Sequence, residues 1–275
     1  MRTLNPNFII EFKSGKYKRL IDKVITDSDL DFQIRENYVN IYYKGNSILK
    51  LWENSTFEIH QKFVKNTSLP EKGTFLINDF LSALPKIKEN VNEVKSKRPT
   101  LEIEYEQLFI RSNNTVNSEL FITDRQFADK EDGADIRFDL TGITWSQPRK
   151  RGQTVPLTFV EVKYGLNNDI KNLSNQLQRY YDKVKSKVND IVKETQSLLD
   201  LKADLGLFGY KGPSALQSLT VSNTIEHAIF IIALIDYNPN SKLFDIDNIT
   251  SLSFSNQIRI FYCGFSIWDQ YLKEL

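Results

Sequence analysis

The feature that most constrains this chain is a strand-like segment, residues 157–165, which is apolar along most of its length and yet carries Glu161 and Lys163. Residues two apart in a strand share a face, so Glu161 and Lys163 point the same way while Val160 and Val162 point into packing. Charged side chains among apolar neighbours lose hydration, which destabilises the fold unless they find partners or a cation. The segment therefore predicts a place where charged groups from other parts of the chain converge.

A second strand-like segment, residues 136–145, places Asp139 upstream of this pair. Asp139, Glu161 and Lys163 can therefore meet at the ends of two neighbouring strands. Mg²⁺ takes oxygen ligands in proteins, usually one or two carboxylates completed by waters and substrate phosphate oxygens. A bound metal ion also lowers the pKa of its water and polarises a phosphoryl oxygen, so such a site needs no histidine. We expect Asp139 and Glu161 to bind Mg²⁺, and Lys163 to orient the attacking water or to offset charge on the phosphate.

Two other acids compete with Asp139 for the first position of this site. Asp135 shares a strand face with Asp139, and Asp124 lies on the preceding strand-like segment. Asp139 is the preferred candidate because Leu140 and the apolar remainder of its strand follow it directly.

The Glu-x-Lys spacing is not specific by itself, since the same triplet begins at Glu11 and at Glu93. Only the triplet at Glu161 has an acidic strand before it and a helical segment after it. That helical segment carries Gln176 and Tyr180, whose spacing of four places them on one helical face. The alternatives are a structural ion pair at Glu161 and, for Gln176 and Tyr180, an exposed amide and a tyrosine at the edge of the core.

The pattern resembles the motif of the PD-(D/E)xK nuclease superfamily, in its Q-x3-Y variant, at Asp139, Glu161-Val162-Lys163 and Gln176-Leu-Gln-Arg-Tyr180. The resemblance implies an α/β, restriction-endonuclease-like fold with an αβββαβ core, in which the Asp and the Glu bind Mg²⁺ (Mn²⁺ substituting) and the Lys serves the hydrolytic water. It also implies that the Val162 carbonyl is a further metal ligand, and that Gln176 and Tyr180 brace the site or touch the DNA backbone. The resemblance covers residues 101–237, and Phe138 stands where the family pattern has a proline.

A helix predicted over residues 101–112 carries an acid within its apolar stripe. Glu104 lies three residues after Leu101 and four before Leu108. In several branches of the superfamily a helical Glu contributes to the metal site, so the resemblance makes Glu104 the candidate and Glu106 the runner-up. A capping interaction or a surface ion pair is the alternative interpretation of Glu104.

Candidate nucleic-acid contacts come from cations near this motif. They are Arg149, Lys150 and Arg151 in the loop before residue 157, and Arg179 on the outside of the following helix. Loops beside a scaffolded site often contact the ligand, and such cations would hold a phosphate backbone without reading its sequence. A solvated loop is an equally good interpretation.

The composition is that of an ordinary globular protein, with 275 residues, of which 40% are hydrophobic and 26% charged. The single cysteine, Cys263, excludes an internal disulfide, and with only two histidines there is no Cys/His cluster for zinc. The longest apolar run, residues 228–235, is far too short to span a membrane. We therefore expect a cytoplasmic protein without a membrane partner, in which residues 228–235 form a buried strand at the centre of a sheet.

The chain divides into two predicted domains, an N-terminal β-rich domain over residues 1–97 with one or two helices, and a nuclease domain over residues 98–275. Strands are predicted in the first domain over residues 8–12, 38–43, 47–52 and 56–64, and the second and third of these form a hairpin. Residues 75–97 have helical spacing, with Pro85 either kinking one helix or starting a second.

The sequence thus predicts a Mg²⁺-dependent endonuclease that hydrolyses phosphodiester bonds, with DNA as the default substrate by resemblance. The chemistry alone does not separate DNA from RNA. Defence or repair would suit such a site, and a homodimer or a larger defence or repair complex would ease cleavage of a duplex. The alternative is a catalytically inactive nucleic-acid-binding or assembly module that retains the nuclease fold.

Overall fold

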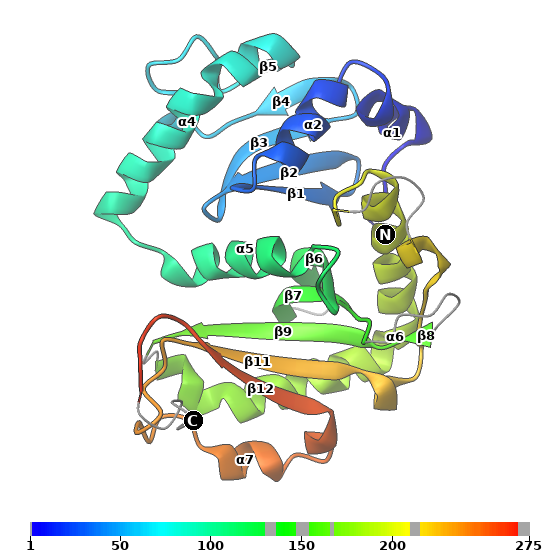
Figure 1. Cartoon of the computed structure of the whole chain (residues 1–275), viewed down its shortest axis with the longest axis vertical. Helices are drawn as coiled ribbons and strands as arrows, with labels where there is room; N and C mark the ends of the chain where they lie inside the picture. The colour runs from blue at the N-terminus through cyan, green and yellow to red at the C-terminus, as the bar shows by residue number, and fades with distance from the viewer. Residues whose placement is uncertain (1, 130–135, 147–153, 166–167, 210–214, 269–275) are drawn as a thin grey trace.

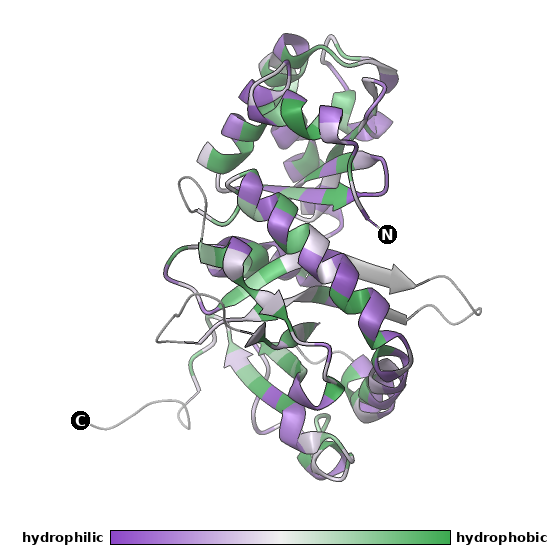
Figure 2. Ribbon diagram, turned by 90° about the vertical axis from the view of Figure 1, so that its right-hand side faces the viewer, coloured by the Kyte–Doolittle hydropathy of each residue, from purple (hydrophilic) through white to green (hydrophobic). Residues whose placement is uncertain are grey.

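The computed structural model describes residues 2–129, 136–146, 154–165, 168–209 and 215–268. Two five-stranded sheets form the framework of an elongated mixed α/β molecule, one from the N-terminal third of the chain and one from the remainder (Figure 1). Hydrophobic residues gather in the strands, while hydrophilic residues recur along the helices (Figure 2). None of the described helices combines the length and the apolar character that a membrane span requires.

The N-terminal sheet has the strand order β1-β2-β3-β4-β5, with all neighbours antiparallel. Its strands are β1 (Leu30–Arg35), β2 (Tyr38–Tyr43), β3 (Asn46–Trp52), β4 (Thr56–Glu58) and β5 (Lys72–Thr74). The helices beside it are α1 (Pro6–Lys13), α2 (Lys18–Thr26), α3 (Gln61–Val64) and α4 (Ile77–Lys97), which is one helix with Pro85 inside. The predicted hairpin is confirmed, since β2 pairs with β3 through a turn in which Lys44 and Gly45 have φ of 46° and 76°.

The predicted strand over residues 8–12 is wrong, because these residues form α1. Phe8 and Phe12 are four residues apart and are 4% and 0% exposed, so one helical face buries both rings. Asn5 caps the helix by accepting a hydrogen bond from the N–H of Asn7, and Pro6 is its first residue. The expectation of one or two helices before residue 98 is also wrong, since the described residues there form four, and the segment 56–64 divides into β4 and α3.

The second sheet has the strand order β12-β11-β9-β7-β6. Its strands are β6 (Leu120–Asp129), β7 (Ile136–Thr144), β9 (Leu157–Tyr164), β11 (Ile229–Ile235) and β12 (Ile258–Cys263). β6, β7 and β9 are antiparallel neighbours, whereas β9, β11 and β12 run parallel. The apolar run that predicts a central strand forms β11, which lies one position from the edge, and β9 holds the centre.

Helices α5 (Leu101–Asn113) and α6 (Leu173–Asp204) cover opposite faces of the second sheet. Val160 and Val162 of β9 pack in one cluster with Ile110 of α5, whereas Phe159 packs in another with Leu177 of α6. The alternation of side chains along a strand produces these two faces. The main elements follow one another as α5, β6, β7, β9, α6 and β11, while β8 (Thr154–Val155), β10 (Thr220–Val221) and α7 (Ile246–Thr250) lie outside this core.

Helix α6 joins the two sheets. It bends at Lys187, where φ and ψ are −127° and 21°. Its last turns enter the hydrophobic core of the N-terminal sheet, in which Leu198 and Leu205 are 2% and 6% exposed. Lys13 of α1 also forms an ion pair with Asp204, the last residue of α6, at 2.8 Å. The core of the N-terminal unit therefore contains side chains from the first 91 residues and from the end of α6.

Candidate active site

Asp139 lies where β7 separates from β9. The two strands pair as far as Leu140 with Val160, and the same register would next join Asp139 to Glu161 and then Phe138 to Val162. Instead, Oδ2 of Asp139 accepts a hydrogen bond from the N–H of Val162 at 2.8 Å. The alternation of side chains also breaks here, because Phe138 packs on the α6 side of the sheet and Leu140 on the α5 side. The carboxylate of Asp139 is thereby directed into the gap between the strands.

Glu161 and Lys163 lie on the face of β9 that α6 covers. Nζ of Lys163 donates to Oε1 of Glu161 at 2.5 Å. From α6, Nε2 of Gln176 donates to the same Oε1 at 2.5 Å and to the hydroxyl of Tyr180 at 2.5 Å. The ring of Tyr180 packs on Phe138, with 4.2 Å between centroids. Four of the predicted site residues therefore form one hydrogen-bonded group.

Two acids, Asp139 and Glu161, lie beside one ammonium, that of Lys163, so the charges at the site are not balanced. Burial raises the pKa of Asp139 well above its usual range, and the Glu161 and Glu106 charges raise it further. Burial also raises the pKa of Glu161, although Lys163 and Gln176 oppose this shift. Burial would lower the pKa of Lys163, but the Glu161 and Asp139 carboxylates raise it overall. An added cation would relieve this excess of buried negative charge.

One oxygen of the group is free to bind such a cation. Oε2 of Glu161 is buried and has no hydrogen-bond partner among the described residues. A buried polar atom without a partner destabilises the folded state, so its retention points to a ligand. The two lone-pair-bearing carboxylates of Asp139 and Glu161 are the oxygen ligands that a hard divalent cation prefers.

The structure corrects the choice among the acids of α5. Glu104, the preferred candidate, pairs with Lys95 of α4 at 2.7 Å. Residues 102 and 106 are four apart and share a helical face, whereas residue 104 lies about 200° around the axis from residue 102. The charge of Glu106 raises the pKa of Asp139, and the charge of Glu102 raises the pKa of Glu161. The charges of Glu102 and Glu106 therefore act on the site, whereas Glu104 is held in its ion pair with Lys95.

Glu102 is the site residue that the sequence did not single out. Among the described residues its side chain makes no hydrogen bond or ion pair, whereas Glu106 is buried and forms an ion pair with Nε of Arg125 at 2.7 Å. The spacing of four between Glu102 and Glu106 is the signal that would have identified it, once one of the two is known to face the sheet.

The remaining predicted residues lie elsewhere. Asp124 is buried in ion pairs with Arg2 and Arg35, the latter at 2.6 Å, which gives it a structural role. Arg179 is exposed on α6. Outside the described residues lie Asp135, Arg149, Lys150 and Arg151.

The residues at the gap fit a Mg²⁺ ion. In a strand, the N–H and C=O of one residue point to the same side, so the Val162 carbonyl faces the gap that Asp139 occupies. The described part of the chain contains no group of three or more His, Cys, Asp or Glu side chains arranged to hold a metal. Mg²⁺ does not need one, because one or two carboxylates suffice beside waters and substrate oxygens.

Comparison with known proteins adds no further information on this site. No family model, curated protein or solved structure matches the chain.

Proposed function

We propose that the chain is a Mg²⁺-dependent nuclease that hydrolyses phosphodiester bonds, with DNA as its substrate. The observation that carries the proposal is the convergence of Asp139, Glu161 and Lys163 where β7 and β9 separate, braced by Gln176 and Tyr180 from α6. They come from three elements, β7, β9 and α6, that are separated in the sequence. A coincidental match to the nuclease motif would leave them scattered in space.

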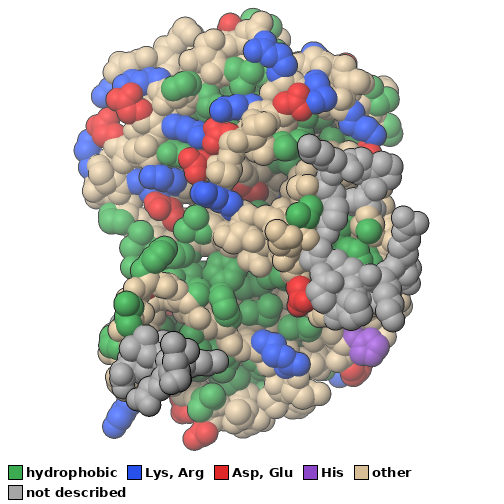
Figure 3. Space-filling model, in the orientation of Figure 1, with side chains coloured by type: hydrophobic (Ala, Val, Ile, Leu, Met, Phe, Trp, Pro, Cys, Tyr) green, Lys and Arg blue, Asp and Glu red, His purple; other side chains and the backbone are tan. Residues whose placement is uncertain are grey.

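The order of the core elements also supports the proposal. From α5 to β11 the core elements follow the order α, β, β, β, α, β, which is the order that the PD-(D/E)xK resemblance implies. On the face shown in Figure 3, Lys and Arg side chains gather mainly on the N-terminal unit, although acidic side chains lie among them.

Each residue of the site has a distinct role in the proposed reaction. Mg²⁺ held by Asp139, Glu161 and the Val162 carbonyl supplies, when bound, an activated water and a polarised phosphoryl oxygen. Lys163 contacts the Glu161 carboxylate at 2.5 Å and is held as an ammonium, so it offsets negative charge on the phosphate instead of taking a proton.

Gln176 and Tyr180 act through Glu161. The amide of Gln176 and the ammonium of Lys163 both donate hydrogen bonds to Oε1 of Glu161. Oε2 of Glu161 is thereby left to bind the cation. Burial raises the pKa of Tyr180 to about 12, so its hydroxyl stays protonated at neutral pH beside the Gln176 amide. Both side chains are therefore positioning residues for the carboxylate.

The proposal is tested with supercoiled plasmid DNA. The purified protein should nick or linearise the plasmid in the presence of Mg²⁺ or Mn²⁺, and EDTA should stop this cleavage. Glu161→Gln and Lys163→Met should each reduce the cleavage rate by about 100-fold or more, because the first removes a carboxylate ligand of Mg²⁺ and the second removes the ammonium that offsets charge on the phosphate. Circular dichroism and thermal melting should show that both variants are folded.

A matched control comes from the chain itself. Glu93 begins another Glu-x-Lys triplet but lies exposed on α4, where it pairs with Lys97. Glu93→Gln should cleave at the wild-type rate. Cleavage that survives both Glu161→Gln and Lys163→Met would sink the proposal, and salt-sensitive DNA binding with no turnover in any divalent ion would favour the inactive binding module.

A further inference from the structure

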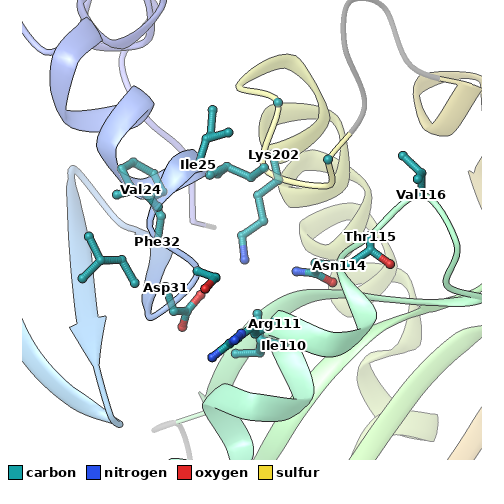
Figure 4. Close-up of a pocket in the computed structure, with 15 residues that line it drawn as sticks. Val24, Ile25, Asp31, Phe32, Ile110, Arg111, Asn114, Thr115, Val116 and Lys202 are labelled. Atoms are coloured by element: carbon teal, nitrogen blue, oxygen red, sulfur yellow. The ribbon is translucent and has the colours of Figure 1, made fainter.

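A cavity separate from the proposed nuclease site lies where the N-terminal unit meets the ends of α5 and α6. Its volume is about 310 Å³, and its walls come from α2, β1 and the C-terminal turns of both helices. Figure 4 shows Lys202 extending from α6 into the space that Asp31, Arg111 and Asn114 also line. A volume of this size lies at the lower end of the range for pockets that bind small organic molecules.

Lys202 is the unusual group in this cavity. It is 1% exposed, and among the described residues its ammonium has one hydrogen bond, to Oε1 of Gln33 at 3.1 Å. An ammonium has three donors and is costly to bury without an anion in contact. Burial lowers the pKa of Lys202 to about 8; Asp31 opposes this shift, while Arg35 and Arg2 add to it.

The nearest acid does not neutralise Lys202 directly. Nε2 of Gln33 donates to both oxygens of the Asp31 carboxylate, at 2.7 and 2.9 Å, so the amide of Gln33 links the acid to the lysine. Two N–H groups of the ammonium therefore have no hydrogen-bond partner among the described residues. The rest of the wall includes the apolar side chains of Ile25 and Phe32.

We propose that this cavity binds a small organic carboxylate with an apolar body, whose carboxylate accepts hydrogen bonds from Lys202. A carboxylate would bring one negative charge to Lys202, which Asp31 reaches only through Gln33, whereas a dianionic phosphate would bring two negative charges towards Asp31. Arg111 is half exposed and pairs with Asp29 at 3.1 Å, so it lies where a carboxylate can approach from solvent. The proposal does not depend on the nuclease activity.

The test uses the full chain and phenylacetate, which has about the size that the cavity allows. Calorimetric titration should show saturable binding of phenylacetate, and at least about tenfold weaker binding of neutral phenylacetamide, because a charge-assisted hydrogen bond is lost. Lys202→Met should weaken phenylacetate binding by a similar factor and leave phenylacetamide unchanged. Equal affinity for the acid and the amide overturns the proposal.

A second variant keeps the test decisive if Lys202→Met does not fold. Thr115 lines the same cavity from a loop, and Thr115→Asp adds a negative charge there without touching Lys202. This variant should weaken phenylacetate binding more than phenylacetamide binding.

Phenyl phosphate should bind more weakly than phenylacetate, and the reverse order overturns the assignment of a carboxylate. Binding that is unaffected by either substitution also overturns the proposal.

Discussion

Replacing Asp139 with asparagine should make the metal-free protein more stable while it abolishes cleavage. Asparagine keeps an oxygen that can accept the 2.8 Å hydrogen bond from the N–H of Val162. The substitution removes the negative charge of Asp139. Burial and the repulsion from the Glu161 and Glu106 carboxylates together disfavour that charge more than Lys163 favours it. Functional sites commonly reduce stability in this way.

The size of the effect follows from the charges that are removed. One repulsion between unit charges about 5 Å apart is about 3 kcal/mol at an effective dielectric constant near 20. The hydrogen bond to a neutral amide is weaker than that to a carboxylate by about 1 kcal/mol. We therefore expect Asp139→Asn to raise the free energy of unfolding in EDTA by about 2 kcal/mol, which corresponds to a rise in Tm of about 4–8 °C.

Two further measurements make this prediction specific. The increase in the free energy of unfolding should shrink as the pH falls from 8 towards about 4. The reason is that a carboxyl whose pKa is raised in the folded state destabilises that state only above the ordinary carboxyl pKa. Saturating Mg²⁺ should stabilise the wild type by about 2–3 kcal/mol and the variant by less, since the variant lacks one ligand. Asp190→Asn, at an exposed position of α6, should change stability by less than about 0.5 kcal/mol. An Asp139→Asn protein that melts below the wild type in EDTA at pH 8 refutes the reasoning.

Three other predictions follow from the site and its supports. Glu102→Gln should slow plasmid cleavage by at least about tenfold, because the charge of Glu102 acts on Glu161 and Lys163, whereas Glu104→Gln should cleave at the wild-type rate. Glu106→Gln should destabilise the protein by about 3–5 kcal/mol in chemical denaturation, because it leaves the fully buried Arg125 without its carboxylate; a loss below 1 kcal/mol contradicts this. Lys163→Arg should fold but cleave poorly in the plasmid assay, since a planar guanidinium does not replace a compact ammonium at 2.5 Å from Glu161; wild-type cleavage would show that only the charge matters.

The sequence was most informative where the local residue pattern and the tertiary packing favour the same structure. The β2–β3 hairpin combines alternating residues with a turn that needs positive φ, and both signals lie within a few residues. The meeting of Glu161, Gln176 and Tyr180 was predictable for a similar reason, because a charge in an apolar strand needs partners and a spacing of four puts the other two on one helical face.

Other features depend on how elements dock, which a single sequence does not encode locally. The apolar run from Phe8 to Phe12 suits a strand or a helix equally, and the cap at Asn5 together with burial against the sheet decides for the helix. The rotation of α5 about its own axis determines that the charge of Glu102 acts on Glu161, while Glu104 pairs with Lys95. These choices are made by packing between segments far apart in the chain.

Helix α6 also determines how the protein can be divided. The bent helix follows a path of about 48 Å, with Gln176 and Tyr180 near its first turns and Leu198 and the following Leu205 at its other end inside the N-terminal core. A fragment that starts at residue 98 would keep the cluster of charges but would expose those two leucines to water. Such a fragment would be prone to self-association, so the first third of the chain is a structural partner of the remainder that cannot be trimmed away.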